Sequence, residues 1–448
     1  MFADATSRGV KNIFSSGSAY VDGVLSGFAW SQKSIEYAFP TSANSYSYNG
    51  YPDHGFNSIS GAQRNMAMFA LDKSFGSAAN DGFSVEGFTN LEIHKGADKS
   101  AEVRLAETTF ETPTAWGFYP ATNPKGGDVW FGVQENYRNP VAGTFAAATM
   151  LHELGHALGL KHGHQPGGNF GTIPFDADSQ EYSLMTYTNY IGDTGGAASY
   201  EHFGAPQTYM MIDIAALQHM YGADFSTNSG RTVYSWKPQG GETFVNGKVA
   251  IDPGGNRIFA TIWDGGGRDT YDLSRYHSGL TIDLSPGGYS KFANNQLSDL
   301  GGGPNNGHAR GNIFNALLYH NNQQSLIEDA KGGSGGDVIV GNVGKNHLYG
   351  MAGVDTLYGA GGQDTLIGGG GTDYFAFAAG YAKDTIDDFQ DNIDKIYLST
   401  SLGIFSGNQA LAFASNSNGD VVFNFGNGNI LVVENVHLNQ ITEFDIVM

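Results

Sequence analysis

The 448-residue chain contains no cysteine, so it can form no disulfide and offers neither a thiolate metal ligand, a cysteine nucleophile nor a cysteine latch. No run of about 18 apolar residues occurs, so no membrane-spanning helix is expected. The start of the chain lacks a basic region followed by an apolar stretch, so no cleavable export signal is visible. Basic residues are few: 23 Lys plus Arg against 44 Asp plus Glu give a net charge of −21. Such a surface repels nucleic acid and anionic membranes, so neither is an expected partner.

Glycine, by contrast, is abundant, with 65 residues that crowd into the second half of the chain. At this length, and with 40% hydrophobic residues, two domains with real cores are expected. Residues 1–220 have the mixed pattern of an α/β domain, and helical periodicity disappears beyond them. We therefore place the domain boundary near Tyr221.

Two helices and four strands are predicted in this first part. Apolar residues at helical spacing indicate helices over residues 143–160, with Gly159 as a stop, and over 209–221, ending at Gly222. Aromatic and β-branched runs predict strands at residues 34–39, 102–107, 115–119 and 128–133.

A nine-residue repeat begins at Gly332 and runs five times without a gap. Its first and fourth positions are always glycine, its sixth is aspartate or asparagine, and its eighth is a large apolar residue. The copies are GGSGGDVIV, GNVGKNHLY, GMAGVDTLY, GAGGQDTLI and GGGGTDYFA. A flexible linker is the alternative interpretation, but a linker requires no large apolar side chain at a fixed phase.

Each repeat offers backbone carbonyls and one carboxylate in a turn, followed by a short strand. Hard oxygen ligands without sulfur or imidazole select calcium, and glycine is needed because such turns use backbone angles that a Cβ forbids. One repeat cannot bury its apolar residue alone, so neighbours should stack into a parallel β-roll. The pattern resembles the RTX family, whose repeats bind calcium between turns. The predicted calcium positions are Gly333, Gly335, Asp337, Gly344, Asn346, Gly353, Asp355, Gly362, Asp364, Gly371 and Asp373. At Asn346, which departs from the usual aspartate, we expect weaker calcium binding.

A further candidate calcium loop precedes the repeats at residues 261–272 (TIWDGGGRDTYD). A solvated turn is the alternative interpretation. The segment resembles the additional calcium loops of RTX proteases, and this resemblance implies a set of ligands. They are Asn228, Gly230, Thr232, Asp264, Gly266, Gly267, Asp269 and Glu328.

The motif HELGHALGLKH at residues 152–162 indicates a metal site. His152 and His156 are four residues apart, so on a helix they share one face and can hold one ion through two imidazoles. Glu153 can reach water on the open side of that ion. A continuing helix would place His162 about 120° off that face, so the chain must bend, and Gly159 permits the bend. Three histidines leave the fourth position of a tetrahedral zinc ion for water, which is typical of a catalytic site.

HExxH alone is a weak signal, whereas HExxHxxGxxH is a strong one. The alternative is that these histidines are ordinary partnered residues. His164 is either a surface residue or an alternative ligand, although the spacing favours His162. The remaining histidines considered lack partner spacing and are interpreted as structural or solvated: His54, His94, His202 and His219.

Met185 lies 23 residues beyond His162, in YSLMTY. In isolation it would be one more core methionine, but its spacing matches the Met-turn beneath the zinc of metzincin proteases. Together, the zinc motif, this Met-turn and the RTX array resemble the serralysins, the secreted bacterial metzincins; residues 209–224 also resemble their inter-domain helix. The resemblance implies that Tyr187 ligates zinc and can move to the reacting oxygen. A buried structural tyrosine is the alternative.

The sequence therefore predicts an α+β metzincin-like catalytic domain, a mixed sheet plus a long zinc-binding helix, over residues 1–220. An all-β RTX domain, a parallel β-roll or β-sandwich that carries a C-terminal secretion signal, is predicted over residues 221–448. One catalytic zinc ion and several structural calcium ions are the expected cofactors. Glu153 would act as general base towards a zinc-bound water and then as proton donor, while zinc and Tyr187 stabilise the oxyanion.

The predicted activity is that of a secreted zinc endopeptidase with broad specificity, because an extended substrate would pair through its backbone with an edge strand near residues 115–119. The expected partners are protein or peptide substrates, a small proteinaceous inhibitor and a type I exporter that reads an uncleaved C-terminal signal. The chain ends in EFDIVM, acidic then apolar like the family's tails, although a simple final strand is the alternative. Export would bring the repeats to calcium, on which they would fold. We expect an extracellular monomer.

Two other classes of protein compete with this interpretation. A non-catalytic RTX surface or adhesive protein could keep a relic site, but an intact Glu153 and Tyr187 disfavour it. A serine hydrolase is suggested by residues 332–336 (GGSGG), which formally match GxSxG. That match lies inside the first repeat, without the strand–turn–helix context that a nucleophile requires, and we reject it.

Overall fold

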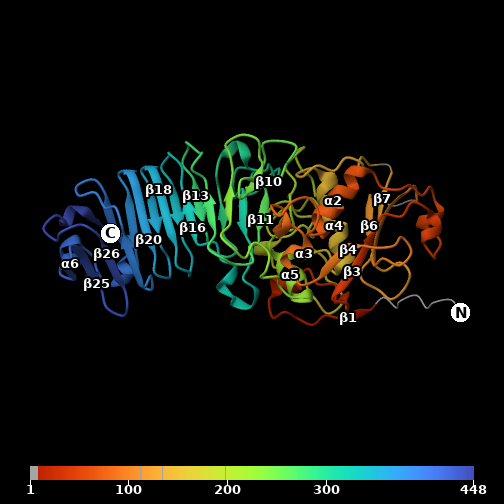
Figure 1. The fold of residues 1–448 in the computed structure, drawn as a ribbon, viewed down its shortest axis with the longest axis horizontal. Coiled ribbons are helices and arrows are strands. Elements are labelled where there is room, and N and C mark those ends of the chain that lie inside the picture. Colours follow the sequence, from red (N-terminus) through yellow and green to blue (C-terminus); the bar gives the residue numbers. More distant parts are fainter. Residues whose placement is uncertain (1–8, 111–113, 134, 197) are drawn as a thin grey trace. The chain divides into compact units, whose positions relative to one another are not determined.

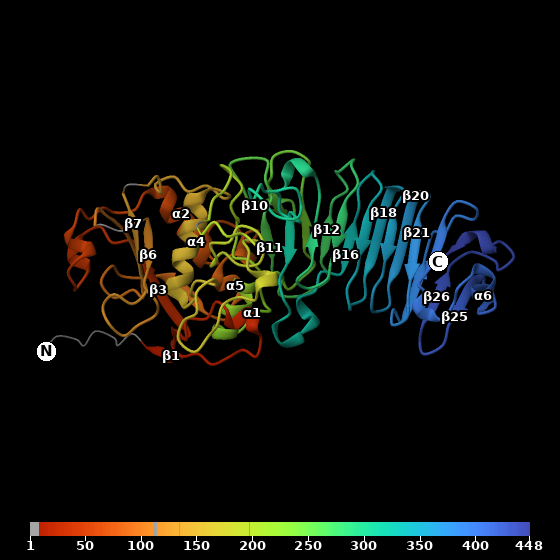
Figure 2. The same cartoon turned by 180° about the vertical axis from the view of Figure 1, so that it is seen from behind.

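The computed structural model describes residues 9–110, 114–133, 135–196 and 198–448, and it divides into two compact units. The N-terminal unit comprises Met1–Asn228, Val249–Gly265 and Leu297–Asn322. The C-terminal unit comprises Ser229–Lys248, Gly266–Gln296 and Gln323–Met448. Figures 1 and 2 show that strands dominate and helices are few, so the fold is mostly β. No helix among the described residues has the length and apolar character needed to span a bilayer.

The N-terminal unit holds most of the helices. They are α1 (Ala19–Asp22), α2 (Gly61–Leu71), α3 (Val85–Phe88), α4 (Phe145–Leu158) and α5 (Met211–Tyr221). Its strands are β1 (Val10–Asn12), β2 (Phe28–Trp30), β3 (Ser34–Ala38), β4 (Glu92–Lys95), β5 (Val103–Thr108), β6 (Ala115–Gly117), β7 (Asp128–Gly132), β11 (Ala260–Ile262) and β15 (Ile313–Asn315). Strand β10 (Lys248–Ile251) contains the point where the chain re-enters this unit.

A five-stranded mixed sheet runs through the N-terminal unit in the order β4-β3-β5-β7-β6. Strands β3, β4, β5 and β7 pair in parallel, and β6 pairs antiparallel with β7 as an edge strand. Every residue of β5 and β7 is buried, as expected for central strands covered on both faces. The four predicted strands correspond to β3, β5, β6 and β7, with ends that differ by one or two residues.

Helix α4 packs against β6, β7 and α2. It begins after Thr144, whose hydroxyl accepts a hydrogen bond of 3.3 Å from the N–H of Ala147, and it ends at Gly159, which has a φ of +110°. A Cβ on Gly159 would also come within 2.3 Å of the carbonyl oxygen of Phe28, so glycine is required there. The helix predicted over residues 143–160 is confirmed, two residues shorter at each end.

The N-terminal unit has two further helices of 11 residues, α5 and α2. Helix α5 was predicted over residues 209–221 and begins at Met211. Helix α2 was not predicted, although its start carries a recognisable signal. Ser60 accepts a hydrogen bond of 3.1 Å from the backbone N–H of Gln63, and Gln63 accepts one of 2.7 Å from the N–H of Ser60.

The C-terminal unit is built from short strands. They are β8 (Val233–Ser235), β9 (Thr243–Val245), β12 (Thr270–Asp272), β13 (Thr281–Asp283), β14 (Tyr289–Ser290), β16 (Asp329–Lys331), β17 (Val338–Val340), β18 (His347–Gly353), β19 (Thr356–Tyr358), β20 (Thr365–Gly371), β21 (Tyr374–Phe377), β22 (Lys383–Ile386), β23 (Lys395–Leu398), β24 (Ala414–Ser417), β25 (Asp420–Asn424), β26 (Ile430–Val433) and β27 (Ile446–Val447). Its single α-helix among the described residues is α6 (Gly407–Leu411).

The nonapeptide repeats supply strands alternately to two sheets of this unit. Strands β17, β19 and β21 are neighbours in one sheet, whereas β18 and β20 are neighbours in the other. All these pairs are parallel and join residues 18 positions apart, as in Ile339↔Leu357 and Leu348↔Leu366. Two repeats therefore complete one turn of the chain, and the parallel-strand region is consistent with the predicted β-roll (Figure 1).

The eighth residue of every repeat points inward. The five side chains are completely buried: Ile339, Leu348, Leu357, Leu366 and Phe375. Since each one is covered by the strand opposite and by its neighbours, a single repeat has no stable core of its own.

Candidate functional site

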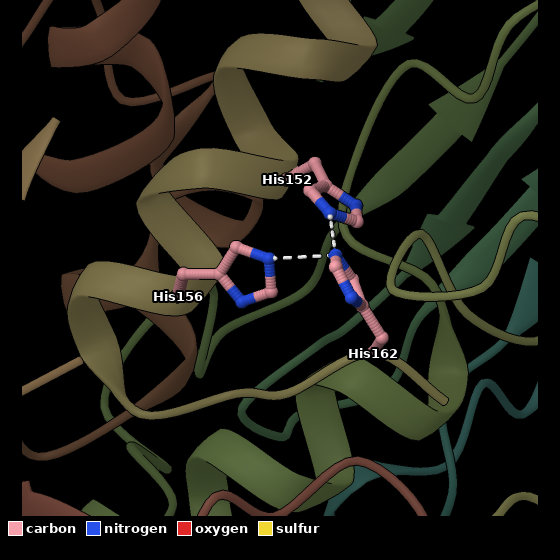
Figure 3. A group of neighbouring side chains, drawn as sticks. All are labelled: His152, His156 and His162. Atoms are coloured by element: carbon pink, nitrogen blue, oxygen red, sulfur yellow. Dashed lines mark hydrogen bonds between the residues drawn. The ribbon is translucent and has the colours of Figure 1, made fainter. Parts of the chain in front are cut away.

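Three imidazoles meet at one point of the N-terminal unit. His152 and His156 project from α4 on successive turns, and His162 projects from the loop that follows the helix (Figure 3). The Nε2 atom of His162 lies 3.1 Å from that of His152 and 3.1 Å from that of His156. The chain bends at Gly159, which allows His162 to return to the face that carries the other two rings.

Backbone carbonyls orient the two helical imidazoles. The Nδ1 atom of His152 lies 2.8 Å from the carbonyl oxygen of Leu184, and that of His156 lies 2.7 Å from the carbonyl oxygen of Leu160. A carbonyl oxygen can only accept a hydrogen bond, so Nδ1 carries the proton in both rings. Each Nε2 therefore presents a lone pair towards the other imidazoles.

The three imidazoles fit a metal ion. Burial lowers the pKa of His152 to about 3, that of His156 well below its usual value, and that of His162 to about 4, so all three are neutral at neutral pH. Their ligand atoms lie within 4.8 Å of one another. Two nitrogens at about 2.1 Å from a tetrahedral zinc ion lie about 3.4 Å apart. Lone pairs 3.1 Å apart repel unless a cation lies between them, so the donor set suits zinc.

Glu153 lies beside this cluster on α4. Its carboxylate is buried, and its Oε2 atom has no hydrogen-bond partner among the described residues. Burial raises the pKa of Glu153 to about 8, against the opposing effect of a hydrogen bond from the backbone of Gly117. A metal cation nearby would favour the ionised carboxylate. The side chain can therefore take a proton from a water at the cluster.

Tyr187 reaches the same cluster from the segment after Met185. Its phenol oxygen lies 3.0 Å from Nε2 of His162. Burial raises the pKa of Tyr187 to about 12, so the phenol stays protonated and can donate a hydrogen bond. His164 is not one of the converging imidazoles; its ring packs on that of Tyr187, with centroids 4.5 Å apart.

Met185 is fully buried and lies against both segments that carry the imidazoles, helix α4 and the loop of His162. A Cβ on Gly155 of α4 would come within 2.8 Å of its sulfur, so the methionine lies directly against the helix. Its carbonyl oxygen accepts a hydrogen bond of 2.8 Å from the N–H of Gly163, the residue after His162. This turn therefore supports both α4 and the loop of the third histidine.

Asp213, which the sequence analysis missed, connects α5 to this turn. Its fully buried carboxylate accepts hydrogen bonds from the hydroxyl of Ser183 at 2.5 Å, from the N–H of Leu184 at 2.8 Å and from the N–H of Met210 at 3.0 Å. Because the carbonyl of Leu184 lies against Nδ1 of His152, the carboxylate positions the imidazole through the backbone of Leu184. An aspartate in the first turn of a predicted helix, three residues after the residue it caps, was the available signal.

The edge strand β6 passes next to the cluster. A Cβ on Gly117 would come within 2.3 Å of the carbonyl oxygen of Glu153 and 2.9 Å of the Cβ of His156. Just beyond β6, the ring of Tyr119 lies edge-on to that of His156, with centroids 5.5 Å apart. The strand predicted to bind substrate thus lies beside the imidazoles.

The sixth residues of the repeats form two ladders in the C-terminal unit. On one side, the carboxylate of Asp355 accepts a hydrogen bond of 2.7 Å from the N–H of Asp337, and that of Asp373 accepts one of 2.9 Å from the N–H of Asp355. On the other, the carboxylate of Asp364 accepts one of 2.8 Å from the N–H of Asn346. Each carboxylate is thus held by the preceding turn on its own side of the roll.

The ladder carboxylates have the character of cation ligands. Burial raises the pKa of Asp337 to about 6 and that of Asp355 to about 7, and it raises the pKa of Asp364 and Asp373 as well. The Oδ2 atoms of Asp355, Asp364 and Asp373 are buried and have no hydrogen-bond partner among the described residues. Buried carboxylate oxygens of this kind fit calcium, which takes oxygen ligands.

The fourth-position glycines allow successive turns to stack. Gly353, Gly362 and Gly371 have φ values of +136°, +127° and +144°. A Cβ on Gly371 would come within 1.5 Å of the carbonyl oxygen of Gly353, and one on Gly353 within 2.3 Å of that of Gly335. On the other side, Gly362 approaches the carbonyl oxygen of Gly344. Of the remaining predicted positions, Gly333 donates a hydrogen bond of 2.6 Å to Asp337.

Asn346 differs from the aspartates. Its Oδ1 atom accepts a hydrogen bond of 2.8 Å from the N–H of Asn342, and its Nδ2 atom donates to the carbonyl oxygen of Glu328 at 2.9 Å. An amide with these contacts offers less charge to a cation than a carboxylate does.

The ladders continue beyond the five repeats, which the sequence analysis did not predict. The carboxylate of Asp384 accepts a hydrogen bond of 3.2 Å from the N–H of Asp364, and that of Asp394 accepts one of 3.0 Å from the N–H of Asp373. Both aspartates precede a completely buried isoleucine by two residues, Ile386 or Ile396, as in the repeats. The pattern of an aspartate two residues before an apolar residue could have indicated this continuation, although these aspartates no longer recur every nine residues.

The predicted loop upstream of the repeats lies partly in each unit. In the C-terminal unit, the carboxylate of Asp269 accepts a hydrogen bond of 2.7 Å from the N–H of Thr232, and the carboxylate of Glu328 accepts one of 2.8 Å from the N–H of Asp269. A Cβ on Gly267 would come within 1.8 Å of the carbonyl oxygen of Gly230. The other predicted positions are Gly266, with a φ of +138°, and, in the N-terminal unit, Asn228, with a φ of 54°, and the buried Asp264.

Ser334 of the GxSxG-like segment lies 2.8 Å from Nδ1 of His277 through its hydroxyl oxygen. Both side chains are exposed, and the segment is a turn between β16 and β17 with no helix after it. The structure therefore offers no strand–turn–helix context for a serine nucleophile.

Comparison with known proteins gives one matching family model, described as Peptidase M10 serralysin C terminal, over residues 223–447. Serralysin G of Dickeya chrysanthemi is 40% identical over 328 residues, which are 69% of this chain and 61% of that protein. The metallopeptidase AprA of Pseudomonas marginalis is 34% identical over 384 residues, 82% of this chain and 73% of that protein. The serralysin of Proteus mirabilis is 33% identical over 414 residues, 86% of this chain and 78% of that protein. The chain thus spans less than two thirds of serralysin G and more of the other two.

Proposed function

Since this chain belongs to the serralysin family of metallopeptidases, we propose that it is a secreted, zinc-dependent endopeptidase. It hydrolyses peptide bonds in extended protein substrates with broad specificity, and calcium folds and stabilises it outside the cell. The observation that carries the proposal is the convergence of three neutral imidazoles beside Glu153, whose buried Oε2 atom has no hydrogen-bond partner among the described residues.

Each part of the chain has its own role in this proposal. Residues 1–220 form a metzincin-like catalytic domain, which is supported by the mixed sheet and by the long helix α4 that carries two of the imidazoles. Residues 221–448 form the calcium-binding RTX domain, which is supported by the parallel strands and the aspartate ladders.

His152, His156 and His162 would hold the zinc ion, and Tyr187 would be a further ligand from the side of His162. Bound there, zinc supplies Lewis acidity to a water molecule and to the carbonyl of the scissile peptide bond. Glu153 takes a proton from that water and later delivers it to the leaving amine. Its buried position keeps this proton away from bulk solvent.

Tyr187 would act on the oxygen of the reacting carbonyl. Its neutral phenol donates a hydrogen bond where negative charge develops. To do so it moves from His162 towards the substrate, and its packing on His164 leaves the hydroxyl end of the ring at the cluster. Met185 would have no chemical role; it would support helix α4 and the loop of His162 by packing against them.

The substrate would lie along β6. Only one edge of this strand pairs with β7, so its other edge can bind an extended peptide through backbone hydrogen bonds. Binding of this kind depends little on side chains, which accounts for broad specificity. The position of Gly117 against Glu153 brings such a peptide close to the imidazoles.

Calcium would bind the ladder carboxylates and the turns between them. The raised pKa values of Asp337 and Asp355 support this proposal, because burial disfavours their ionised form and a bound cation would offset that effect. The predicted ligands of the upstream loop would hold further calcium in the same way. Because the roll needs these ions, it would stay unfolded where calcium is scarce and fold after export by a type I exporter that reads the C-terminal end.

The test is digestion of denatured casein by the calcium-loaded protein. We expect activity that a zinc chelator removes, that added zinc restores and that serine-directed inhibitors leave unchanged. Glu153→Gln should keep zinc bound and lower kcat by about 100- to 10,000-fold, because it removes the general base and leaves the imidazoles in place. A protein without activity, or an active Glu153→Gln variant, would contradict the proposal; the first result would favour a calcium-folded surface protein.

A further inference from the structure

A buried lysine lies next to the third histidine. Lys161 is only 3% exposed. Its ammonium group donates hydrogen bonds to four backbone carbonyl oxygens. They belong to Gly23 at 2.5 Å, Gln165 at 2.8 Å, Gly171 at 2.8 Å and His162 at 3.3 Å. Among the described residues, no carboxylate lies within ion-pair distance of this ammonium group.

The four carbonyls come from segments that have no regular structure in common. Gly23 follows α1, whereas Gln165 and Gly171 belong to the loop that leads away from His162. We call these four carbonyl oxygens, of Gly23, His162, Gln165 and Gly171, the carbonyl cage. Since an ammonium group has three N–H donors, it can satisfy most of this cage. Hydrogen bonds from a charged donor are also stronger than those between neutral groups.

The backbone of Lys161 joins the same two segments. Its N–H donates a hydrogen bond of 2.7 Å to the carbonyl oxygen of Val24, and the neighbouring residues Leu25 and Leu160 form an isolated antiparallel bridge. The stem of the side chain is also confined, because a Cβ on Gly167 would come within 2.9 Å of its Cδ. The ammonium group is therefore fixed in place, and it holds the loop on the other side.

We propose that Lys161 is a positioning residue of the metal centre: its ammonium group acts as an internal cation that fixes the loop of His162. The inference rests on the proposed zinc site. His162 is the one histidine ligand outside α4, and the helix alone does not determine where its imidazole lies. Without the ammonium group, the four carbonyls lose a shared donor, and the loop between His162 and Gly171 loses the contact that joins it to Gly23.

The first experiment measures zinc affinity by competition with a chromophoric chelator. Lys161→Met keeps the length of the side chain but removes the charge and the donors. We expect it to weaken zinc binding by about 10- to 100-fold, the usual effect of removing a contact that orients a ligand. The matched control is Lys99→Met, at an exposed lysine, which should bind zinc as the wild type does. Cobalt substituted for zinc gives a visible spectrum, which should change in Lys161→Met and not in the control.

The second experiment is chemical rescue. Lys161→Ala removes a propylammonium group, so added n-propylammonium should enter the cage and restore much of the lost zinc affinity and the cobalt spectrum. Tetramethylammonium has the charge but no N–H donor, and it should restore nothing. The wild type titrated with both amines corrects for any direct effect on the metal.

The outcomes separate this inference from the proposed function. Wild-type protein that binds no zinc would contradict the proposed function. Zinc binding by the wild type with unchanged affinity in Lys161→Met, or no rescue of a folded Lys161→Ala, would overturn the role of Lys161. A metal-free Lys161→Met variant that does not fold would overturn it as well, because Lys161 would then hold the whole unit rather than the site.

Discussion

The carboxylate of Asp213 accepts a hydrogen bond of 2.8 Å from the N–H of Leu184, while the carbonyl of the same Leu184 lies 2.8 Å from Nδ1 of His152. The backbone of one residue, Leu184, thus connects α5 to the first imidazole of the cluster. An oriented carbonyl fixes both the proton and the rotation of an imidazole, and such contacts strengthen metal binding. Asp213 is therefore expected to matter for the metal although it lies outside the cluster.

Asp213→Asn should weaken this connection. The amide nitrogen cannot accept a hydrogen bond. If it takes the place of Oδ2, the N–H groups of Leu184 and Met210 both lose their acceptor; if it takes the place of Oδ1, the hydroxyl of Ser183 loses its acceptor. We expect zinc affinity to fall by about 10-fold or more and the free energy of unfolding to fall by about 1–3 kcal/mol. Chelator competition and denaturant titration measure the two effects. Ser183→Ala removes one of the three hydrogen bonds and should give a smaller change; the reverse order would count against this account.

Gly155→Ala tests the contact between α4 and Met185. Alanine is favoured over glycine within a helix by about 1 kcal/mol, but here its Cβ would come within 2.8 Å of the methionine sulfur. In the wild-type background we expect Gly155→Ala to leave the free energy of unfolding unchanged or to lower it. In a Met185→Ala background the same substitution should stabilise the protein by about 1 kcal/mol. A double-mutant cycle measured by denaturant unfolding gives the coupling, and additive effects would show that the sulfur does not press on the helix.

Gly371→Ala tests the stacking of the calcium turns. Its φ of +144° and the 1.5 Å approach of a Cβ to the carbonyl oxygen of Gly353 both exclude a side chain. We expect a loss of at least about 1–2 kcal/mol in the stability of the calcium-loaded roll and weaker calcium binding. Gly370→Ala is the matched control in the same strand, because no atom lies within 4 Å of its Cβ position. Thermal unfolding of both variants as a function of calcium concentration measures the difference. Equal unfolding temperatures for Gly371→Ala and Gly370→Ala would refute the packing argument.

Acid should partly replace calcium in the roll. Burial raises the pKa of Asp337 to about 6 and that of Asp355 to about 7, from a usual value of 3.8. A carboxyl group whose folded pKa is raised contributes stability that is present below pH 3.8 and is lost as the pH rises through the folded value. In chelator, residues 338–377 should therefore be more protected from hydrogen exchange at pH 5 than at pH 8.

The comparison needs exchange rates corrected for intrinsic pH dependence, measured on peptides from residues 338–377 of the full chain. This region-specific measurement avoids the histidines of the N-terminal unit, whose lowered pKa values act in the opposite direction. With calcium bound, protection should be high at both pH values. Greater protection at pH 8 than at pH 5 in chelator would contradict the assignment of these carboxylates.

The repeat array could be predicted closely from the sequence because its pattern is local. Each strand of the repeats begins at the seventh residue of a nonapeptide, and Ile339 and Leu357, both at the eighth position, pair in parallel. The bend at Gly159 was equally predictable, since helical geometry and the spacing to His162 left no other solution. Both inferences depend on residues near one another in the chain.

What the sequence could not show depends on distant contacts. The cage around Lys161 joins Gly23 to Gly171, and no local pattern marks a lysine that is buried among carbonyls. The return of residues 249–265 and 297–322 to the N-terminal unit is likewise a matter of tertiary packing. Asp384 and Asp394 were missed for a different reason, because the ladder continues there while the nine-residue spacing has ended.

The most direct test of the central claim is the zinc content and X-ray absorption spectrum of the purified, calcium-loaded Glu153→Gln variant. The account predicts one zinc ion per chain, with nitrogen ligands at about 2.0–2.1 Å and the scattering of three imidazoles, and His162→Ala should lose most of it. A protein that contains no transition metal, or zinc whose spectrum lacks imidazole scattering, would contradict it.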